Sequence, residues 1–135
     1  MPRAEAIITR AREYIGTPYH HQARAPGVGL DCIGFIVCIL QSLGYEVRDR
    51  KTYPMAFRPH EFVAIVADHL HSKPIESMCP SDLLLIRPGS FILHSAIYLG
   101  NDSVIHCGKP NGVEERGMHD WRVCIAHCFD MQNPK

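Results

Sequence analysis

The 135-residue sequence has no net charge, few aromatic residues and no long hydrophobic run. Its 14 lysine and arginine residues balance 14 aspartate and glutamate residues, and no basic cluster stands out. A chain with this balance has no electrostatic attraction of its own for nucleic acid or for an anionic membrane surface. We therefore expect neither nucleic acid nor a membrane among its partners.

The sequence also lacks repeats, linkers and a recognisable signal peptide. Its first residues, MPRAEAIITRAREYIG, carry a charge every few positions, unlike the apolar core of an export signal. We expect the protein to be synthesised in the cytoplasm. Its length suits one domain, residues 1–135, and its composition of 46% hydrophobic and 21% charged residues suits an ordinary globular core.

Six cysteines and nine histidines invite a disulfide framework or a metal site. A disulfide framework needs an oxidising compartment, and the cytoplasm, where we expect the protein to be synthesised, is reducing. No CxxC or HExxH pair occurs, so we expect no metal and no other cofactor. Four cysteines lie inside apolar segments, as reduced core thiols do: Cys38, Cys107, Cys124 and Cys128.

Hydrophobic periodicity predicts helices in the first half of the chain and strands in the second. Helices are expected over residues 3–15, from residue 31 to just before residue 44, and within residues 58–72, with a loop over residues 17–30. Strands are expected over residues 82–87, 91–99, 103–107 and 122–129. This order predicts an α+β fold in which a helix packs on an antiparallel sheet.

The second predicted helix begins with a polar pair inside the apolar stretch VGLDCIGFIVC. Asp31 is suited to the N-cap, because its carboxylate accepts hydrogen bonds from the unpaired amides of the first turn. Cys32 then lies in that first turn. Unpaired amides and the positive end of the helix dipole favour a thiolate there, so Cys32 is a candidate nucleophile.

A cysteine nucleophile needs a histidine base and a third group to orient it, and two predicted strands supply His94 and His106. A three-residue hairpin loop over residues 100–102 places Ala96 opposite His106. The two histidines then share one face of the sheet, with Cα atoms roughly 7–8 Å apart. A two-residue loop is expected to put them on opposite faces.

Three stretches, GTPYHHQARAPGVGLDCIGF, PSDLLLI and HSAIYLGNDSVIHC, resemble the NlpC-type cell-wall cysteine peptidases of papain-like fold. The first stretch is most similar to the small branch of that family encoded beside tail genes in phages and prophages. The resemblance implies hydrolysis of a peptidoglycan stem peptide through a thioester, at the γ-D-glutamyl–diaminopimelate bond. It also implies phage tail proteins as partners and a place on the virion tail.

Carried over position by position, the resemblance implies a role for five residues. Cys32 is the nucleophile, His94 the general base and acid, and His106 the group that orients His94. Tyr19 matches the tyrosine whose hydroxyl faces the cysteine, and Asp31 matches the carboxylate that gathers the free amine of the stem peptide. The backbone amide of Cys32 is an expected oxyanion donor, since it points outward at the helix start.

The chain departs from the resembled family at two places. Ile33 stands where many bacterial members have serine, and His20, His21 and Gln22 stand where they have Trp-Gly-Gly. Two alternatives therefore stay open: a catalytically silent tail or scaffold binding module of the same fold, and an intracellular amide or acyl hydrolase. Asp31 could act as a helix cap alone, and Tyr19 could simply pack on the sheet. Met118 and Trp121 are expected to be ordinary packing residues.

Overall fold

The computed structural model describes residues 3–49, 53, 59–87 and 93–135. Three α-helices of 11 residues each lie at Arg3–Glu13 (α1), Cys32–Ser42 (α2) and Pro59–His69 (α3). They confirm the helices predicted from hydrophobic periodicity. None of the helices in the described part of the chain is both long enough and apolar enough to cross a bilayer.

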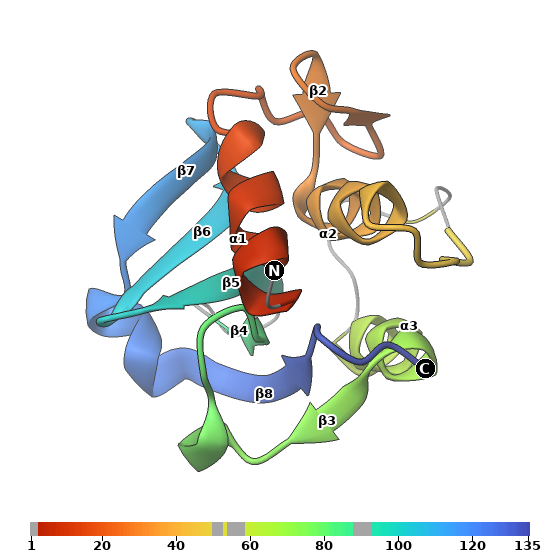
Figure 1. Cartoon of the computed structure of the whole chain (residues 1–135). Coiled ribbons are helices and arrows are strands. Elements are labelled where there is room, and N and C mark those ends of the chain that lie inside the picture. The colour runs from red at the N-terminus through yellow and green to blue at the C-terminus, as the bar shows by residue number, and fades with distance from the viewer. Residues whose placement is uncertain (1–2, 50–52, 54–58, 88–92) are drawn as a thin grey trace.

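One six-stranded sheet forms the centre of the molecule (Figure 1). Its order is β3-β8-β4-β5-β6-β7, and every neighbouring pair is antiparallel. The strands are β3 (His71–Lys73), β4 (Leu83–Ile86), β5 (His94–Gly100), β6 (Ser103–Gly108), β7 (Gly112–Gly117) and β8 (Ile125–Asp130). Helix α2 contacts β5 and β6, so the expected α+β arrangement of a helix on an antiparallel sheet is confirmed.

The structure corrects the sequence-based prediction at several elements. Two short strands, β1 (Arg24–Ala25) and β2 (Gly29–Leu30), pair in the segment expected to be a loop. Strands β3 and β7 were not predicted, because both are polar edge strands without an apolar alternation. Short 3₁₀ helices lie at Ile75–Ser77 (η1) and His119–Cys124 (η2), so the predicted strand over residues 122–129 begins only at β8. Residues 58 and 91–92 of the predicted elements lie outside the described residues.

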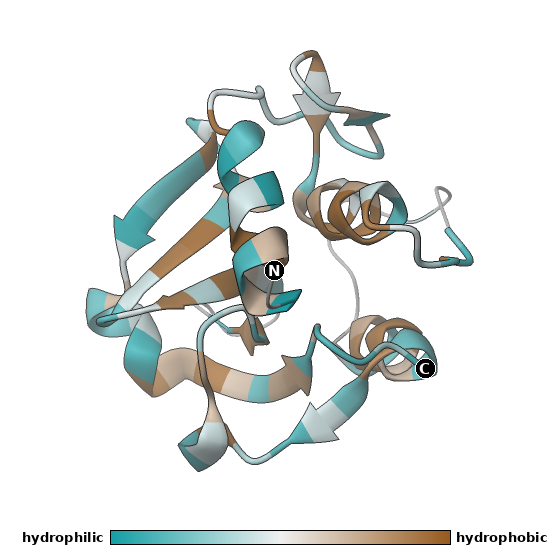
Figure 2. Ribbon diagram, in the orientation of Figure 1, coloured by the Kyte–Doolittle hydropathy of each residue, from teal (hydrophilic) through white to brown (hydrophobic). Residues whose placement is uncertain are grey.

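Hydrophobic side chains pack on both faces of the sheet, because successive residues of a strand point to opposite sides. On the helix side, Phe35 and Ile39 of α2 pack with Leu85 of β4 and Ile97 of β5. A smaller cluster on the other side contains Leu84, Ile86, Ala96, Val104, Met118 and Cys128, with Trp121 packed against it. Figure 2 shows the matching hydrophobic colouring of α2 and the central strands.

The register of the β5–β6 hairpin is the one predicted, although its turn is different. Ala96 pairs with His106, as expected. The turn itself contains two residues, Asn101 and Asp102, both with positive φ (50° and 58°), which suits a tight hairpin turn. A register shift between Tyr98 and Gly100 inserts one extra residue into β5. With a two-residue turn and no bulge, His94 and His106 would point to opposite faces of the sheet. The extra residue in β5 brings them back to the same face.

Candidate active site

Two features define the start of α2: the side chain of Asp31 caps the helix, and the chain at Ala23 passes close to Gly34. Asp31 is the N-cap, and the backbone amide of Gly34 donates to its Oδ1 at 2.7 Å. A Cβ atom at Gly34 would lie 2.2 Å from the carbonyl oxygen of Ala23, so only glycine fits there. Cys32 follows the cap as the first residue of α2 and is partly buried. Gly34 therefore lets the segment before β1 pass close to the helix start.

The carboxylate of Asp31 is buried and accepts hydrogen bonds from several protein groups. Oδ1 also accepts from the guanidinium of Arg24 at 3.2 Å, while Oδ2 accepts from the Gln22 amide at 2.8 Å and from the Tyr53 hydroxyl. The capping role of Asp31 is thus confirmed. Its role toward a substrate amine stays a prediction, and it requires one of these donors to give way.

The surroundings of the Cys32 thiol oppose its ionisation. Burial first, and the charge of Asp31 second, raise the pKa of the thiol to about 11, although the Ser95 hydroxyl and two backbone amides act in the other direction. The position at the start of α2 alone favours the thiolate. In this structure desolvation and the capping carboxylate outweigh that effect, so the thiol is neutral at neutral pH.

His94 and His106 lie edge to face on neighbouring strands, as the register predicts. Nε2 of His94 and Nδ1 of His106 are 2.8 Å apart, at hydrogen-bond distance. Burial lowers the pKa of His94 to about 3, and the nearby His106 and Arg116 add to this effect. Burial also lowers the pKa of His106, although the carboxylate of Glu114 works against it. Both imidazoles are therefore neutral at neutral pH.

Two residues that sequence reasoning missed complete the surroundings of the histidines. Glu114 lies directly opposite His106 on β7, and its Oε2 is 3.1 Å from Nε2 of His106. Trp121, expected only to pack, lies edge to face against both rings, with centroids 5.6 Å from His94 and 5.0 Å from His106. The guanidinium of Arg116 lies 3.9 Å from the Trp121 ring centroid. Only the turn signal KPNG before β7 could have suggested a strand carrying Glu114.

Ser95 connects the start of α2 to β5. Its hydroxyl donates to the carbonyl oxygen of Cys32 at 3.0 Å, and His94 is the preceding residue of the strand. Within the described residues, no hydrogen bond joins the Cys32 thiol to the imidazole of His94. Ser95 therefore holds the backbone of Cys32 next to β5, while the side chain of His94, the residue before it, packs with His106 and Trp121.

Tyr19 lies on the cysteine side of this arrangement. Burial first, and then the charges of Cys32 and Asp31, raise the pKa of its hydroxyl to about 12. A short bridge to Leu30 of β2 fixes its backbone, and Nζ of Lys109 lies 5.5 Å from its ring centroid. The tyrosine hydroxyl is thus neutral at neutral pH. That this hydroxyl faces the Cys32 thiol stays a prediction.

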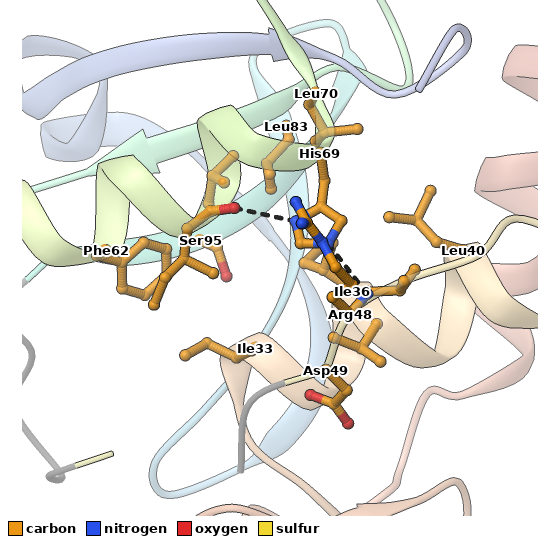
Figure 3. Close-up of a pocket in the computed structure, with 14 residues that line it drawn as sticks. Ile33, Ile36, Leu40, Arg48, Asp49, Phe62, His69, Leu70, Leu83 and Ser95 are labelled. Carbon is orange, nitrogen blue, oxygen red and sulfur yellow. Dashed lines mark hydrogen bonds between the residues drawn. The ribbon is translucent and has the colours of Figure 1, made fainter. Parts of the chain in front are cut away.

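A mainly apolar pocket lies between α2 and α3 (Figure 3). Ile33 and Ser95, the residues that follow Cys32 and His94, lie together with Phe62 toward one end of it, and Leu40 lies toward the other. His69 ties α3 to the chain after α2, because its Nε2 accepts from the Arg48 amide at 3.0 Å. Ile33 therefore contributes an apolar side chain to this pocket.

Comparison with known proteins supports one family. Residues 16–124 match the NlpC/P60 family. The NlpC/p60 domain of the peptidoglycan hydrolase SagA has 27% sequence identity and a TM-score of 0.67, covering 95% of this chain and 98% of that domain. No curated protein matches the chain in sequence.

Two further solved structures share the fold at lower identity. An NlpC/P60 family protein from Bacillus cereus is 20% identical, with a TM-score of 0.72 over 96% of this chain, which spans only 40% of that protein. RipD from Mycobacterium tuberculosis is 14% identical, with a TM-score of 0.67 over 97% of this chain and 98% of its own, and is described as a non-catalytic domain protein adapted to peptidoglycan binding. The family match and the shared papain-like architecture together lead to one conclusion: the chain belongs to the NlpC/P60 family.

Proposed function

We propose that the protein is a cysteine peptidase that hydrolyses the γ-D-glutamyl–diaminopimelate bond of peptidoglycan stem peptides through a thioester. The observation that carries this proposal is the hydrogen bond from Ser95 to the carbonyl oxygen of Cys32, which holds the cysteine next to the strand that bears His94. The similarity to a domain of the peptidoglycan hydrolase SagA supports the same substrate class.

The proposed reaction starts from a neutral thiol and a neutral imidazole. As Sγ of Cys32 attacks the scissile carbonyl carbon, Nδ1 of His94 takes the thiol proton, and the Cys32 amide stabilises the oxyanion. The C–N bond then breaks, and the imidazolium returns the proton to the leaving amine. Water attacks the thioester with His94 again as base, which releases the carboxylic acid and restores the thiol.

The charges around the cysteine suggest how a stem peptide is oriented. Its charged groups are expected on the side of Tyr19 and Lys109, because the pocket beside Ile33 is lined mainly by hydrophobic side chains. Burying an unpaired charge in such a pocket is strongly unfavourable. We therefore place the polar backbone of the substrate across the cysteine and away from α3.

The product of the wild-type protein tests the proposed function. A disaccharide tetrapeptide with a γ-D-Glu–diaminopimelate bond is incubated with the protein, and the fragments are identified by mass spectrometry. We expect a disaccharide dipeptide and a free diaminopimelyl-D-alanine. Protein alkylated beforehand at Cys32 serves as the control and should leave the substrate intact. Cleavage at another bond, or by the alkylated protein, contradicts the proposal.

A second candidate function is peptidoglycan binding without turnover. Ile33 in place of the usual serine and the absence of a thiol–imidazole hydrogen bond among the described residues favour it. The fold itself accommodates this role, since RipD is described as non-catalytic. Sedimentation of the protein with insoluble peptidoglycan, with no fragment released over many hours, would support this candidate.

The association with a phage tail stays a prediction. It rests on the similarity of the stretch GTPYHHQARAPGVGLDCIG to the phage and prophage branch. Copurification of the protein with assembled tails is the measurement that checks it.

Alkylation of Cys32 by iodoacetamide is expected to accelerate steadily between pH 7 and pH 10. Iodoacetamide reacts with the thiolate, or with the thiol while a neighbouring base takes its proton, and a thiol pKa raised to about 11 leaves little thiolate until the solution becomes alkaline. Mass spectrometry of the labelled peptides gives the rate, with the other five cysteines as references in the same spectra. A plateau already reached below the ordinary thiol pKa of about 8.5 would show an ionised Cys32 instead.

A further inference from the structure

A neutral imidazole carries its proton on one of two nitrogens, and only one choice leaves His94 able to act as the base. Nε2 of His94 is committed to the hydrogen bond with Nδ1 of His106, 2.8 Å away. The proton of a thiol must therefore go to Nδ1 of His94, which has to be unprotonated before the reaction. That requires the proton of His94 to sit on Nε2 and to be donated to His106.

The hydrogen bond between the two rings is compatible with either direction of donation. If Nε2 of His94 donates, Nδ1 of His94 is free to accept a proton. If Nδ1 of His106 donates instead, Nε2 of His94 accepts and its Nδ1 carries a hydrogen. Because both rings are neutral, the pair of histidines by itself does not select between these two states.

Glu114, on the other side of the His106 ring, selects one of the two directions of donation. Its Oε2 is 3.1 Å from Nε2 of His106, and the Asn111 side chain donates to its Oε1 at 3.1 Å. An ionised carboxylate only accepts hydrogen bonds, so the proton of His106 is held on Nε2. Nδ1 of His106 is then an acceptor, and His94 must donate to it from Nε2.

We propose that Glu114 is a positioning residue that fixes the tautomers of His106 and His94, so that Nδ1 of His94 is the proton acceptor. Its catalytic meaning rests on the proposed function, in which His94 is the base for Cys32. Glu114 itself does not touch the reacting atoms. It acts through His106, as a fourth member behind the cysteine and the two histidines.

The packing around the two imidazole rings holds them in position for the hydrogen bonds from His94 to His106 and from His106 to Glu114. Trp121 contacts both imidazoles, and the guanidinium of Arg116 lies over the Trp121 ring on the side of β7. Gly108 is the next residue of β6 on the same face, and a Cβ atom there would come within 3.4 Å of both histidine rings. A Cβ atom at that position would require His106 to shift by a few tenths of an ångström, so Gly108 leaves room for both rings.

Without the Glu114 carboxylate, the tautomers of His106 and His94 are expected to be no longer fixed, while the protein stays folded. In Glu114→Ala, ¹⁵N NMR of labelled histidines should show His94 changing from protonated Nε2 alone to a mixture of both tautomers. The kcat for stem-peptide hydrolysis should fall about 10- to 100-fold with little change in KM, because the reactive tautomer becomes the minor species and the two rings lose their fixed orientation. Glu114→Gln, which keeps an accepting oxygen, should lie between the wild type and the alanine variant.

Glu115→Ala is the matched control. Glu115 is the next residue of β7, points to the other face and pairs with Arg12 at 2.6 Å, so its loss should leave tautomers and kcat as in the wild type. The proposal is overturned if His94 keeps a single tautomer in Glu114→Ala, or if Glu115→Ala changes the tautomers in the same way. The NMR measurement needs no substrate, so a wild type that fails to cleave peptidoglycan refutes the proposed function while the tautomer result still decides the role of Glu114.

Discussion

Cys32→Ala is expected to lower kcat for hydrolysis of the γ-D-Glu–diaminopimelate bond by at least about 10⁴-fold. The variant has no atom that can form the thioester, and the remaining oxyanion donor and binding groups supply only a small part of the acceleration. The assay is fragment release from a disaccharide tetrapeptide, followed by mass spectrometry. Binding of insoluble peptidoglycan should survive the substitution, because the thiol contributes little contact area.

Cys38→Ala is the appropriate control for that loss. Cys38 lies on the same helix, and its thiol contacts the carbonyl oxygen of Arg24 at 3.7 Å, so its replacement disturbs α2 to a similar extent. We expect less than a tenfold change in kcat from it. Equal losses in both variants would point to damage of the helix, and an active Cys32→Ala would exclude the thioester route.

The parts of the site that could be predicted from the sequence are those with local signals. Asp31 caps α2 as expected, because capping joins a side chain to amides within the next three residues. The pairing of Ala96 with His106 was also predictable, since a short hairpin leaves few registers. The turn was not, because a β-bulge near Leu99 depends on packing across the sheet as well as on the turn residues.

The parts that could not be predicted are set by contacts between distant segments. Strand β7 has the sequence GVEERG, and only its first two residues are buried, so hydrophobic alternation does not reveal it. Its start is held by hydrogen bonds between Val113 and the chain at Gly16 and Thr17. Glu114 therefore reaches His106 through a tertiary arrangement. The contact of Trp121 with both histidines also depends on tertiary structure, because Trp121 lies in a 3₁₀ helix that packs against the histidine strands.

The electrostatics of the site show why a single local rule is insufficient. The start of a helix favours a thiolate by a modest amount, whereas desolvation and an adjacent carboxylate both disfavour it. In this structure the second pair of effects is larger, and the pKa of Cys32 rises to about 11 while that of His94 falls to about 3. In the proposed reaction the proton of the thiol must therefore move during the attack on the carbonyl, and the rate depends on a base in the correct tautomer.

His94→Gln is accordingly expected to lower kcat about 10³- to 10⁴-fold, because His94 is the base that takes the thiol proton in the proposed reaction. Iodoacetamide alkylation of Cys32 at pH 7 should also slow in this variant. At pH 10 the two proteins should react at similar rates, because hydroxide then removes the proton without the imidazole. Labelling rates measured by mass spectrometry across this pH range give the comparison directly.

His127→Gln supplies the control, since His127 is an exposed histidine on strand β8. It should leave both the hydrolysis rate and the alkylation profile unchanged. If His94→Gln retained wild-type kcat, a base other than His94 would be at work. If its alkylation rate stayed below that of the wild type even at pH 10, the substitution would have closed access to the thiol rather than removed a base. A difference between the variants that is large at pH 7 and disappears in alkali is the result that identifies His94 as the group that accepts the proton of Cys32.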